Sequence, residues 1–280
     1  MITHTYINGI QIDSEKCFLQ KLGNIAMAGV EFANYQRGGV SGQILSRPLY
    51  RGFNINLQYF VKSSNSSDLV VQRDRLVSYF QNSDDPDTYL KTLGFELSDG
   101  TIKEVEVLFS QVGNEIDPSN IDHAVFTVTA VSEREYLTIR TSYSTTITKT
   151  PGGGMPIPMA IPMDMSVSIG TEVTTLTNLG NASAYPIIRV YGDFSASFNL
   201  INDTTSKTFT FGVALGVGDY IDFDFYNRTA VKNATNSVLG SVTGDWWSIA
   251  PGTNQIRLTS PDSGDNGYAV VTHKNTYRNI

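Results

Sequence analysis

The chain has 280 residues, of which 40% are hydrophobic and 17% charged, and its formal net charge is −7. This length favours two domains, and the apolar content is enough for buried cores, which excludes a disordered chain. Few charges together with abundant Thr, Ser, Asn, Gly and aromatic residues are typical of β-sheet proteins. Neither half of the chain is basic, so we do not expect a protein that holds nucleic acid through its phosphates.

The N-terminus and the single cysteine indicate the cellular context. The chain begins without a basic start followed by an apolar run, so no signal peptide is expected. No stretch approaches the ~20 apolar residues that span a bilayer. Cys17 is the one cysteine, which allows no intramolecular disulfide, and we expect it to be a small buried residue. The sequence therefore predicts a soluble protein made in the cytoplasm, without a membrane partner.

Residues 1–140 have mainly the patterns of β-strands. Asn8-Gly9 lies between apolar residues and predicts a hairpin turn. Residues 50–61 alternate apolar and polar positions, as expected of a half-buried strand. Further strands are predicted at 89–97, 102–109 and 124–131.

One segment of this first half departs from the strand pattern. Residues 66–80 place Leu69, Leu76 and Phe80 at helical spacing, and either of the two serines at 66–67 is the expected N-cap. We expect this helix to cover one face of the sheet. The first half is therefore predicted to be a β-rich α+β domain with one helix.

Residues 141–163 are predicted to link two domains. Three glycines at 152–154 give a flexible joint. Pro156, Pro158 and Pro162 then predict an extended strap, because each proline fixes its own φ and restrains the residue before it. Apolar Met and Ile residues between the prolines indicate that the strap lies against a surface.

Residues 164–280 are predicted to form an all-β domain. Short apolar runs are separated by Gly, Asn, Asp and Pro turns, which favours a β-sandwich or jelly roll. Pro186 is expected to start an edge strand, because proline lacks the N–H that an interior strand uses. The predicted strands lie near 167–177, 185–191, 194–201, 207–215, 219–226, 246–249, 254–259 and 267–273.

No catalytic, metal-binding or cofactor-binding residues are expected. His4, His123 and His273 lie in separate segments without a Cys, Asp or Glu at metal-ligand spacing, so structural or surface roles are favoured. The sequence contains no zinc-protease, nucleophile-elbow, phosphate-loop or paired-cysteine motif. We therefore expect a protein that is not an enzyme.

Two pairs of residues carry weaker alternatives. Asp222 and Asp224 lie two apart on a predicted strand, so their carboxylates face the same side and could serve a glycosidase or a calcium site. A solvated strand face is favoured, because no third acidic ligand follows. Trp246 and Trp247 could stack on a sugar, but adjacent strand residues face opposite ways. We expect Trp247 in the core and Trp246 at the rim.

The second half contains several motifs that build a fold and mark no active site, such as the turn at Pro251-Gly252 with Asn254 bonding its own backbone. The motifs are the Gly-rich stretch with its Pro/apolar strap, Asn178-Leu179-Gly180 followed by Tyr185-Pro186, residues 198–205, residues 218–222, and Trp246-Trp247 followed by Pro251-Gly252-Thr253-Asn254. In their order and spacing, these motifs resemble the C-terminal domain of siphophage distal tail proteins.

The resemblance implies a structural protein at the tip of a long, non-contractile phage tail, within the virion. It implies a hexameric ring built by the N-terminal domain, with DNA passing through the lumen without specific binding. It also implies an outward-facing C-terminal domain of galectin-like or jelly-roll fold. The implied partners are the tail tube protein, the tape-measure protein and a tail-associated adhesin or lysin.

Two alternatives stay open at this point. The first is a carbohydrate-binding adhesin that recognises host-wall glycan, with Trp246, Asp222 and Asp224 as candidate contacts. The second is a glycan-cleaving enzyme that uses the two aspartates.

Overall fold

The computed structural model describes residues 2–23, 30–31, 34–36, 43–45, 49–50, 52, 54–82, 89–115, 123–149, 173–262 and 264–278. The chain forms two compact units, the first from residues 1–140 with the chain end from Tyr277 onward, and the second from Thr141 to Thr276. The second unit is therefore an insertion, because the chain leaves the first unit after Arg140 and returns to it at Tyr277. Both units are mainly antiparallel β, and α1 is the one α-helix of the described residues, which confirms the predicted fold class.

The first unit is built on a twisted antiparallel sheet in the order β2-β1-β9-β10-β11-β8-β3, with β12 added beside β10. Two short ribbons, β4 with β7 and β5 with β6, belong to the same part of the chain. The strands are β1 (Ile2–Ile7), β2 (Ile10–Gln11), β3 (Cys17–Gly23), β4 (Val30–Glu31), β5 (Asn34–Gln36), β6 (Gln43–Leu45), β7 (Leu49–Tyr50), β8 (Asn54–Lys62), β9 (Lys91–Leu97), β10 (Ile102–Glu115), β11 (His123–Val131) and β12 (Leu137–Ile139).

The predicted hairpin at Asn8-Gly9 is confirmed. Strand β1 pairs with β2 so that Ile7 faces Ile10 across a two-residue turn. Both turn residues have positive φ, 50° at Asn8 and 81° at Gly9. This is the backbone that the hairpin turn needs, and Asn and Gly are the residues that adopt it with the least strain.

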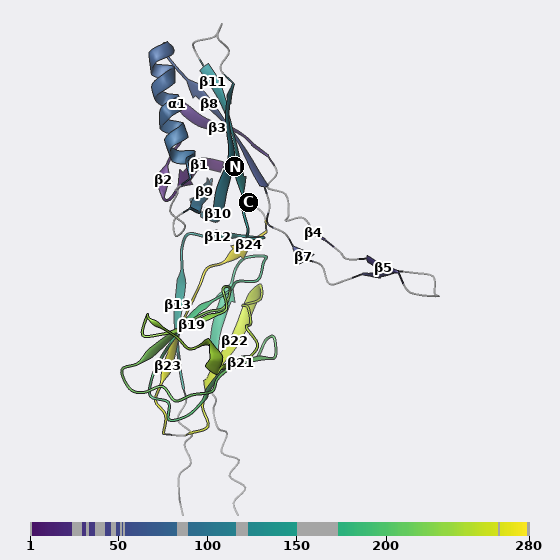
Figure 1. Ribbon diagram of the computed structural model, residues 1–280, viewed down its shortest axis with the longest axis vertical. Helices are drawn as coiled ribbons and strands as arrows, with labels where there is room; N and C mark the ends of the chain where they lie inside the picture. Colours follow the sequence, from purple (N-terminus) through teal and green to yellow (C-terminus); the bar gives the residue numbers. More distant parts are fainter. Residues whose placement is uncertain are drawn as a thin grey trace, which may run out of the picture. The chain divides into compact units, whose positions relative to one another are not determined.

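Helix α1 (Ser66–Phe80) packs against β8, β10 and β11 (Figure 1). Its buried residues are the predicted Leu69, Leu76 and Phe80. The predicted serine cap is wrong, because Asn65 is the N-cap and its side-chain oxygen accepts the Asp68 N–H at 2.9 Å. Asn65 has the extended backbone of a cap residue, whereas both serines already belong to the first helical turn.

The core of the first unit lies between α1 and the sheet. Strand β8 alternates as predicted, with Ile55, Leu57 and Tyr59 buried and polar residues between them. The ring of Phe80 packs between Tyr59 and Phe109, with centroid distances of 5.6 and 5.1 Å. Cys17 is buried at one end of β3, and burial raises the pKa of its thiol to about 12. This thiol therefore behaves as a small apolar side chain, as expected.

The second unit is a sandwich of two antiparallel sheets. One has the order β13-β23-β15-β18-β19-β20 and the other the order β14-β22-β16-β17-β21. Inward-facing residues of both sheets, such as Ile188 and Phe223 of the first and Leu200 and Phe209 of the second, form one core. The strands are β13 (Tyr143–Thr148), β14 (Thr174–Asn178), β15 (Ile187–Tyr191), β16 (Phe198–Asn202), β17 (Lys207–Phe211), β18 (Tyr220–Asp224), β19 (Thr229–Lys232), β20 (Asn236–Ser237), β21 (Val242–Gly244), β22 (Gly252–Thr259), β23 (Tyr268–His273) and, at the return to the first unit, β24 (Thr276–Tyr277).

The second unit differs from the predicted organisation in several places, including strands β19, β20 and β21, which were not predicted. Residues 141–148 were expected in the linker, but β13 pairs along its whole length with β23. Residues 246–249 were expected to be a strand, yet only an isolated bridge joins Ile249 to Ala184. Pro186 was expected to start an edge strand, but β15 lies inside its sheet between β23 and β18. Proline is compatible with this place because it precedes the first paired residue.

The remaining part of the predicted linker is the strap. Pro156, Pro158 and Pro162 lie outside the described residues, so the strap stays a prediction. The segment that carries it connects β13 to β14, which are the end strands of the two different sheets.

Candidate functional site

The two tryptophans of the second unit occupy different environments. Trp247 is fully buried, its Nε1–H donates to the Leu200 carbonyl at 3.1 Å, and its ring lies 4.7 Å from that of Phe225. Trp246 is half-buried, with its ring edge-on to Phe209 and Phe225. The expected contrast of a core Trp247 and a rim Trp246 is therefore present. Two core rings hold Trp246 in place, which leaves it a poor platform for stacking on a sugar.

The Pro-Gly-x-Asn turn is closed by one buried side chain. The Asn254 amide accepts the Ala250 N–H at 2.9 Å and donates to the carbonyls of Ala250 and Gly252 at 2.8 and 3.1 Å. Gly252 has a φ of 89°, which favours glycine, and Pro251 precedes it. These residues fix the start of β22, which agrees with a role in building the fold.

A second buried asparagine closes the Asn-Leu-Gly segment. The amide of Asn178 donates to the carbonyls of Ala182 and Ile249 and accepts the N–H groups of Gly180 and Thr276. A Cβ on Gly180 would lie 1.8 Å from the Thr276 carbonyl oxygen, so only glycine fits there. The motif residues of this domain therefore satisfy buried backbone groups.

The two candidate carboxylates are both held by neighbouring groups. Asp222 forms a two-pronged ion pair with Arg189, with Nε–Oδ1 and Nη2–Oδ2 distances of 2.7 and 2.8 Å. Asp224 accepts the N–H groups of Tyr226 and Asn227 and the Asn227 side-chain amide, at 2.8–2.9 Å. One aspartate is thus neutralised and the other closes a turn, which favours structural roles over a catalytic pair.

Asp222 belongs to a group whose other members, Arg189 and three tyrosines, were not predicted as site residues. Tyr191 of β15 is paired in register with Tyr268 of β23 on one side and with Tyr220 of β18 on the other. We call these three side chains the tyrosine row, and Arg189 with Asp222 the Arg–Asp fork. The outward alternation of Tyr185, Ile187, Arg189 and Tyr191 was visible in the sequence, but strand order and register were not.

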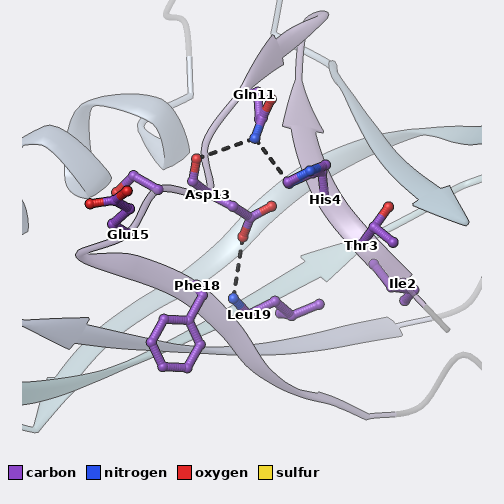
Figure 2. Close-up of a pocket in the computed structure, with 9 residues that line it drawn as sticks. Ile2, Thr3, His4, Gln11, Asp13, Glu15, Phe18 and Leu19 are labelled. Atoms are coloured by element: carbon purple, nitrogen blue, oxygen red, sulfur yellow. Dashed lines mark hydrogen bonds between the residues drawn. The ribbon is translucent and has the colours of Figure 1, made fainter. Parts of the chain in front are cut away.

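In the first unit a pocket of about 410 Å³ lies between β1 and β3 (Figure 2). The Asp13 carboxylate accepts the N–H and, at 2.8 Å, the hydroxyl of Thr5 on β1, and it accepts the Leu19 N–H of β3 at 3.2 Å. Asp13 thus joins two strands that do not pair. The pocket is lined by Ile2, Thr3, His4, Gln11, Asp13, Ser14, Glu15, Phe18 and Leu19.

The polar groups around this pocket bond mainly to one another. The Gln11 amide lies 2.9 Å from Nδ1 of His4, and the Tyr59 hydroxyl donates to the Thr5 hydroxyl at 3.0 Å. Burial raises the pKa of Tyr59 well above its ordinary value, so this hydroxyl keeps its proton. The arrangement supports a strand-joining role for Asp13 and supplies no activated nucleophile or base.

The three histidines lie apart, as expected. His4 lines the pocket, His123 stacks on Phe60 with a centroid distance of 5.1 Å, and the buried His273 has its Nε2 3.1 Å from the Thr177 carbonyl. Within the part of the chain that the structure describes, no group of three or more His, Cys, Asp or Glu side chains is placed to hold a metal ion. In the same residues, no helix is long and apolar enough to cross a membrane.

Comparison with known proteins identifies a matching domain family and similar solved structures. Residues 179–277 match the family of the siphovirus-type tail component, C-terminal domain. No curated protein sequence matches the chain. The crystal structure of the Dit protein of phage SPP1, described as a paradigm of the hub adsorption apparatus of phages that infect Gram-positive bacteria, matches with a TM-score of 0.67 and 13% identity, over 97% of this chain and 98% of that one.

Two structures of the phage P2 baseplate in its activated conformation, with Ca and with Sr, give TM-scores of 0.43 at 10% identity, over 94% of this chain and 92% of theirs. The resemblance to siphophage distal tail proteins is confirmed by the family match and by the fold of the SPP1 protein. The chain has the fold of SPP1 Dit over nearly its whole length, and its residues 179–277 match the family of the siphovirus-type tail component, C-terminal domain.

Proposed function

We propose that the chain is a structural protein of a phage tail tip, a ring-shaped hub that joins the tail tube to the host-adsorption apparatus. The observation that carries this proposal is the tail-component domain at residues 179–277 inside a chain that shares the whole SPP1 Dit fold. The SPP1 protein is described as a hub. The described motif residues of this chain, which close turns and fill the core, fit such a building role.

The first unit is the proposed ring-forming part, and a hexamer is the proposed stoichiometry. A small sheet domain with its own core can pack side by side with copies of itself around a closed symmetry axis. The tail tube protein and the tape-measure protein are the proposed neighbours of the ring, and a tail-associated adhesin or lysin is the proposed distal partner. The protein would be made in the host bacterial cytoplasm and reside in the virion.

DNA would pass through the lumen of this ring without specific binding. The net charge of −7 supports this part of the proposal, because a wall without excess cations does not retain phosphates. No catalytic step is part of the proposed function.

The mass of the full chain in solution tests the ring. Light scattering across micromolar concentrations, with electron microscopy of the same sample, should give a closed homo-oligomer, and a mass of six chains is expected. Isolated tails labelled with an antibody to this chain should carry the label at the distal end. A strict monomer together with tails that lack the protein would refute the hub.

A further inference from the structure

The two outer faces of the sandwich in the second unit have different side chains. On the six-stranded sheet, the tyrosine row crosses β23, β15 and β18 at one level. On the described strands of the five-stranded sheet, the outward positions carry no aromatic residue and are mainly Thr, Asn and Gln. Both faces lie on the outside of the same sandwich, so the tyrosine row is a property of one face alone.

The rings of the tyrosine row pack against one another, which restricts the positions of their hydroxyl groups. The rings of Tyr191 and Tyr268 stack with a centroid distance of 4.6 Å and an interplanar angle of 16°. Tyr220 lies on the other side, 6.2 Å from Tyr191. Tyrosine has few rotatable bonds, so contacts through such a row cost little conformational entropy.

The Arg–Asp fork lies at the next level of the same strands and is also pre-organised. The guanidinium of Arg189 stands over the ring of Tyr220, 4.5 Å from its centroid, while it bonds Asp222. Hydrogen bonds to Asp222 and then to Tyr191 raise the pKa of Arg189 above its ordinary value. A guanidinium has five N–H donors, so Arg189 keeps further N–H groups beside these bonds, and the Asp222 carboxylate keeps further lone pairs. A vicinal diol fits such a place, because one hydroxyl can accept from Arg189 while the other donates to Asp222.

The charged residues of this face indicate whether it fits an anionic or an uncharged ligand. The cation of Arg189 is matched by Asp222, and Asp224 is bound by the turn at Asn227. The outward neighbours Thr146, Val270, Thr272 and Thr229 are uncharged. A polyanion needs unpaired cations along its path, and none of these outward strand positions supplies one. A face that presents tyrosine hydroxyls and rings beside an ion-paired Arg–Asp fork fits an uncharged, hydroxyl-rich polymer.

We propose that the outer face of β23, β15 and β18, with the tyrosine row and the Arg–Asp fork at its centre, binds an uncharged glycan chain. Arg189 and Asp222 hydrogen-bond vicinal hydroxyls, and the tyrosine row contacts the adjoining sugar through ring edges and hydroxyls. This inference goes beyond the proposed hub and does not require the ring. It moves the candidate sugar contact from Trp246 to the tyrosine row and gives Asp222 the role of a binding residue.

The test uses the full chain and a defined panel of ligands. Immobilised neutral oligosaccharides of glucose, galactose, mannose and N-acetylglucosamine are compared with two anionic polymers, hyaluronan and poly(glycerol phosphate). We expect saturable binding to a neutral oligosaccharide. Tyr191→Thr, and the double variant Arg189→Thr with Asp222→Thr, should each weaken that binding by about tenfold or more, as loss of one or two hydrogen bonds predicts.

A matched control exists on the other face. Arg257 and Asp203 form an equivalent fork on the five-stranded sheet, with both N–O distances at 2.6 Å. The double variant Arg257→Thr with Asp203→Thr should leave glycan binding unchanged. Thermal melting of every variant checks the fold, and Tyr268→Thr, whose side chain is more exposed, replaces Tyr191→Thr if that variant does not fold.

Several outcomes would overturn the proposal. They are no binding to any neutral oligosaccharide of the panel, binding to the anionic polymers alone, and equal losses in the face and control variants. Variants that bind sugar normally but fail to enter tails would identify the face as a protein-docking surface instead. The mass of the oligomer, measured for the same variants, separates failure of this proposal from failure of the hub.

Discussion

The two units are both built of antiparallel strands, but they differ in their use of buried asparagine side chains. In the second unit, fully buried asparagines close the loops, as Asn178 and Asn254 do. In the first unit, the core depends mainly on apolar alternation along strands such as β8 and on the apolar face of α1. Many sequences satisfy an apolar alternation, whereas few residues can replace an asparagine that makes four bonds.

The family match falls on residues 179–277, almost entirely within the second unit, because the matching family describes a C-terminal domain. The fold of the first unit is nevertheless shared with SPP1 Dit, at an overall identity of 13%.

The largest expected effect is that of Trp247→Ala. Truncating a fully buried Trp costs ~3–5 kcal/mol, a large part of the ~5–15 kcal/mol that stabilises a domain. The second unit should unfold or melt far below the parent while the first keeps its transition, as followed by calorimetry of the full chain. Trp246→Ala is the matched control and should cost much less. A Trp247→Ala protein that melts like the parent would contradict the assignment.

Gly180→Ala should produce the next largest effect. The added methyl group would lie 1.8 Å from the Thr276 carbonyl oxygen and 2.7 Å from the Thr276 nitrogen. Overpacking of this kind costs ~1–3 kcal/mol, and chemical denaturation of the full chain should show it in the second unit. Gly240→Ala is the control, because nothing lies within 4 Å of its added Cβ. Equal midpoints for the two variants would show that the segment adjusts freely.

Asn65→Ala tests how the first unit depends on local helix chemistry. Removing the side chain that accepts the Asp68 N–H should cost about 1 kcal/mol and lower only the transition of the first unit. Asn65→Ser should recover most of this loss, because serine is also a good cap. If Asn65→Ala and Asn65→Ser are equally destabilised, the cap bond is not what stabilises α1.

The smallest expected effect is a loss of stability at low pH. Hydrogen bonds from Lys16 and from the Ser64 backbone lower the pKa of Asp68 from 3.8 to about 2. Because the folded pKa lies below the unfolded one, the contribution of Asp68 to stability is present above pH 3.8 and is lost as the pH falls towards 2. NMR titration of the Asp68 carboxyl should give this low value, and Lys16→Met should raise it. A titration near 3.8 in both proteins would show that the bond to Lys16 does not persist in solution.

The sequence by itself determined features that depend on neighbours along the chain. The Asn8-Gly9 turn, the helix at 66–80 and the strand alternation that buries Leu57 follow from local backbone preference and apolar spacing. The predicted N-cap, Ser66 or Ser67, differs from the observed Asn65, because all three residues offer a side-chain oxygen. The contrast between Trp246 and Trp247 was also readable, from the motif that follows them.

Tertiary structure decided what depends on strand order and register. The insertion of the second unit between Arg140 and Tyr277, the interior place of β15 after Pro186 and the pairing of β13 with β23 all join segments far apart in the sequence. The tyrosine row also exists only because three strands from distant positions align Tyr268, Tyr191 and Tyr220 at one level. A shift of one residue in any of these pairings would turn a tyrosine inward, and no local pattern in one sequence specifies that register.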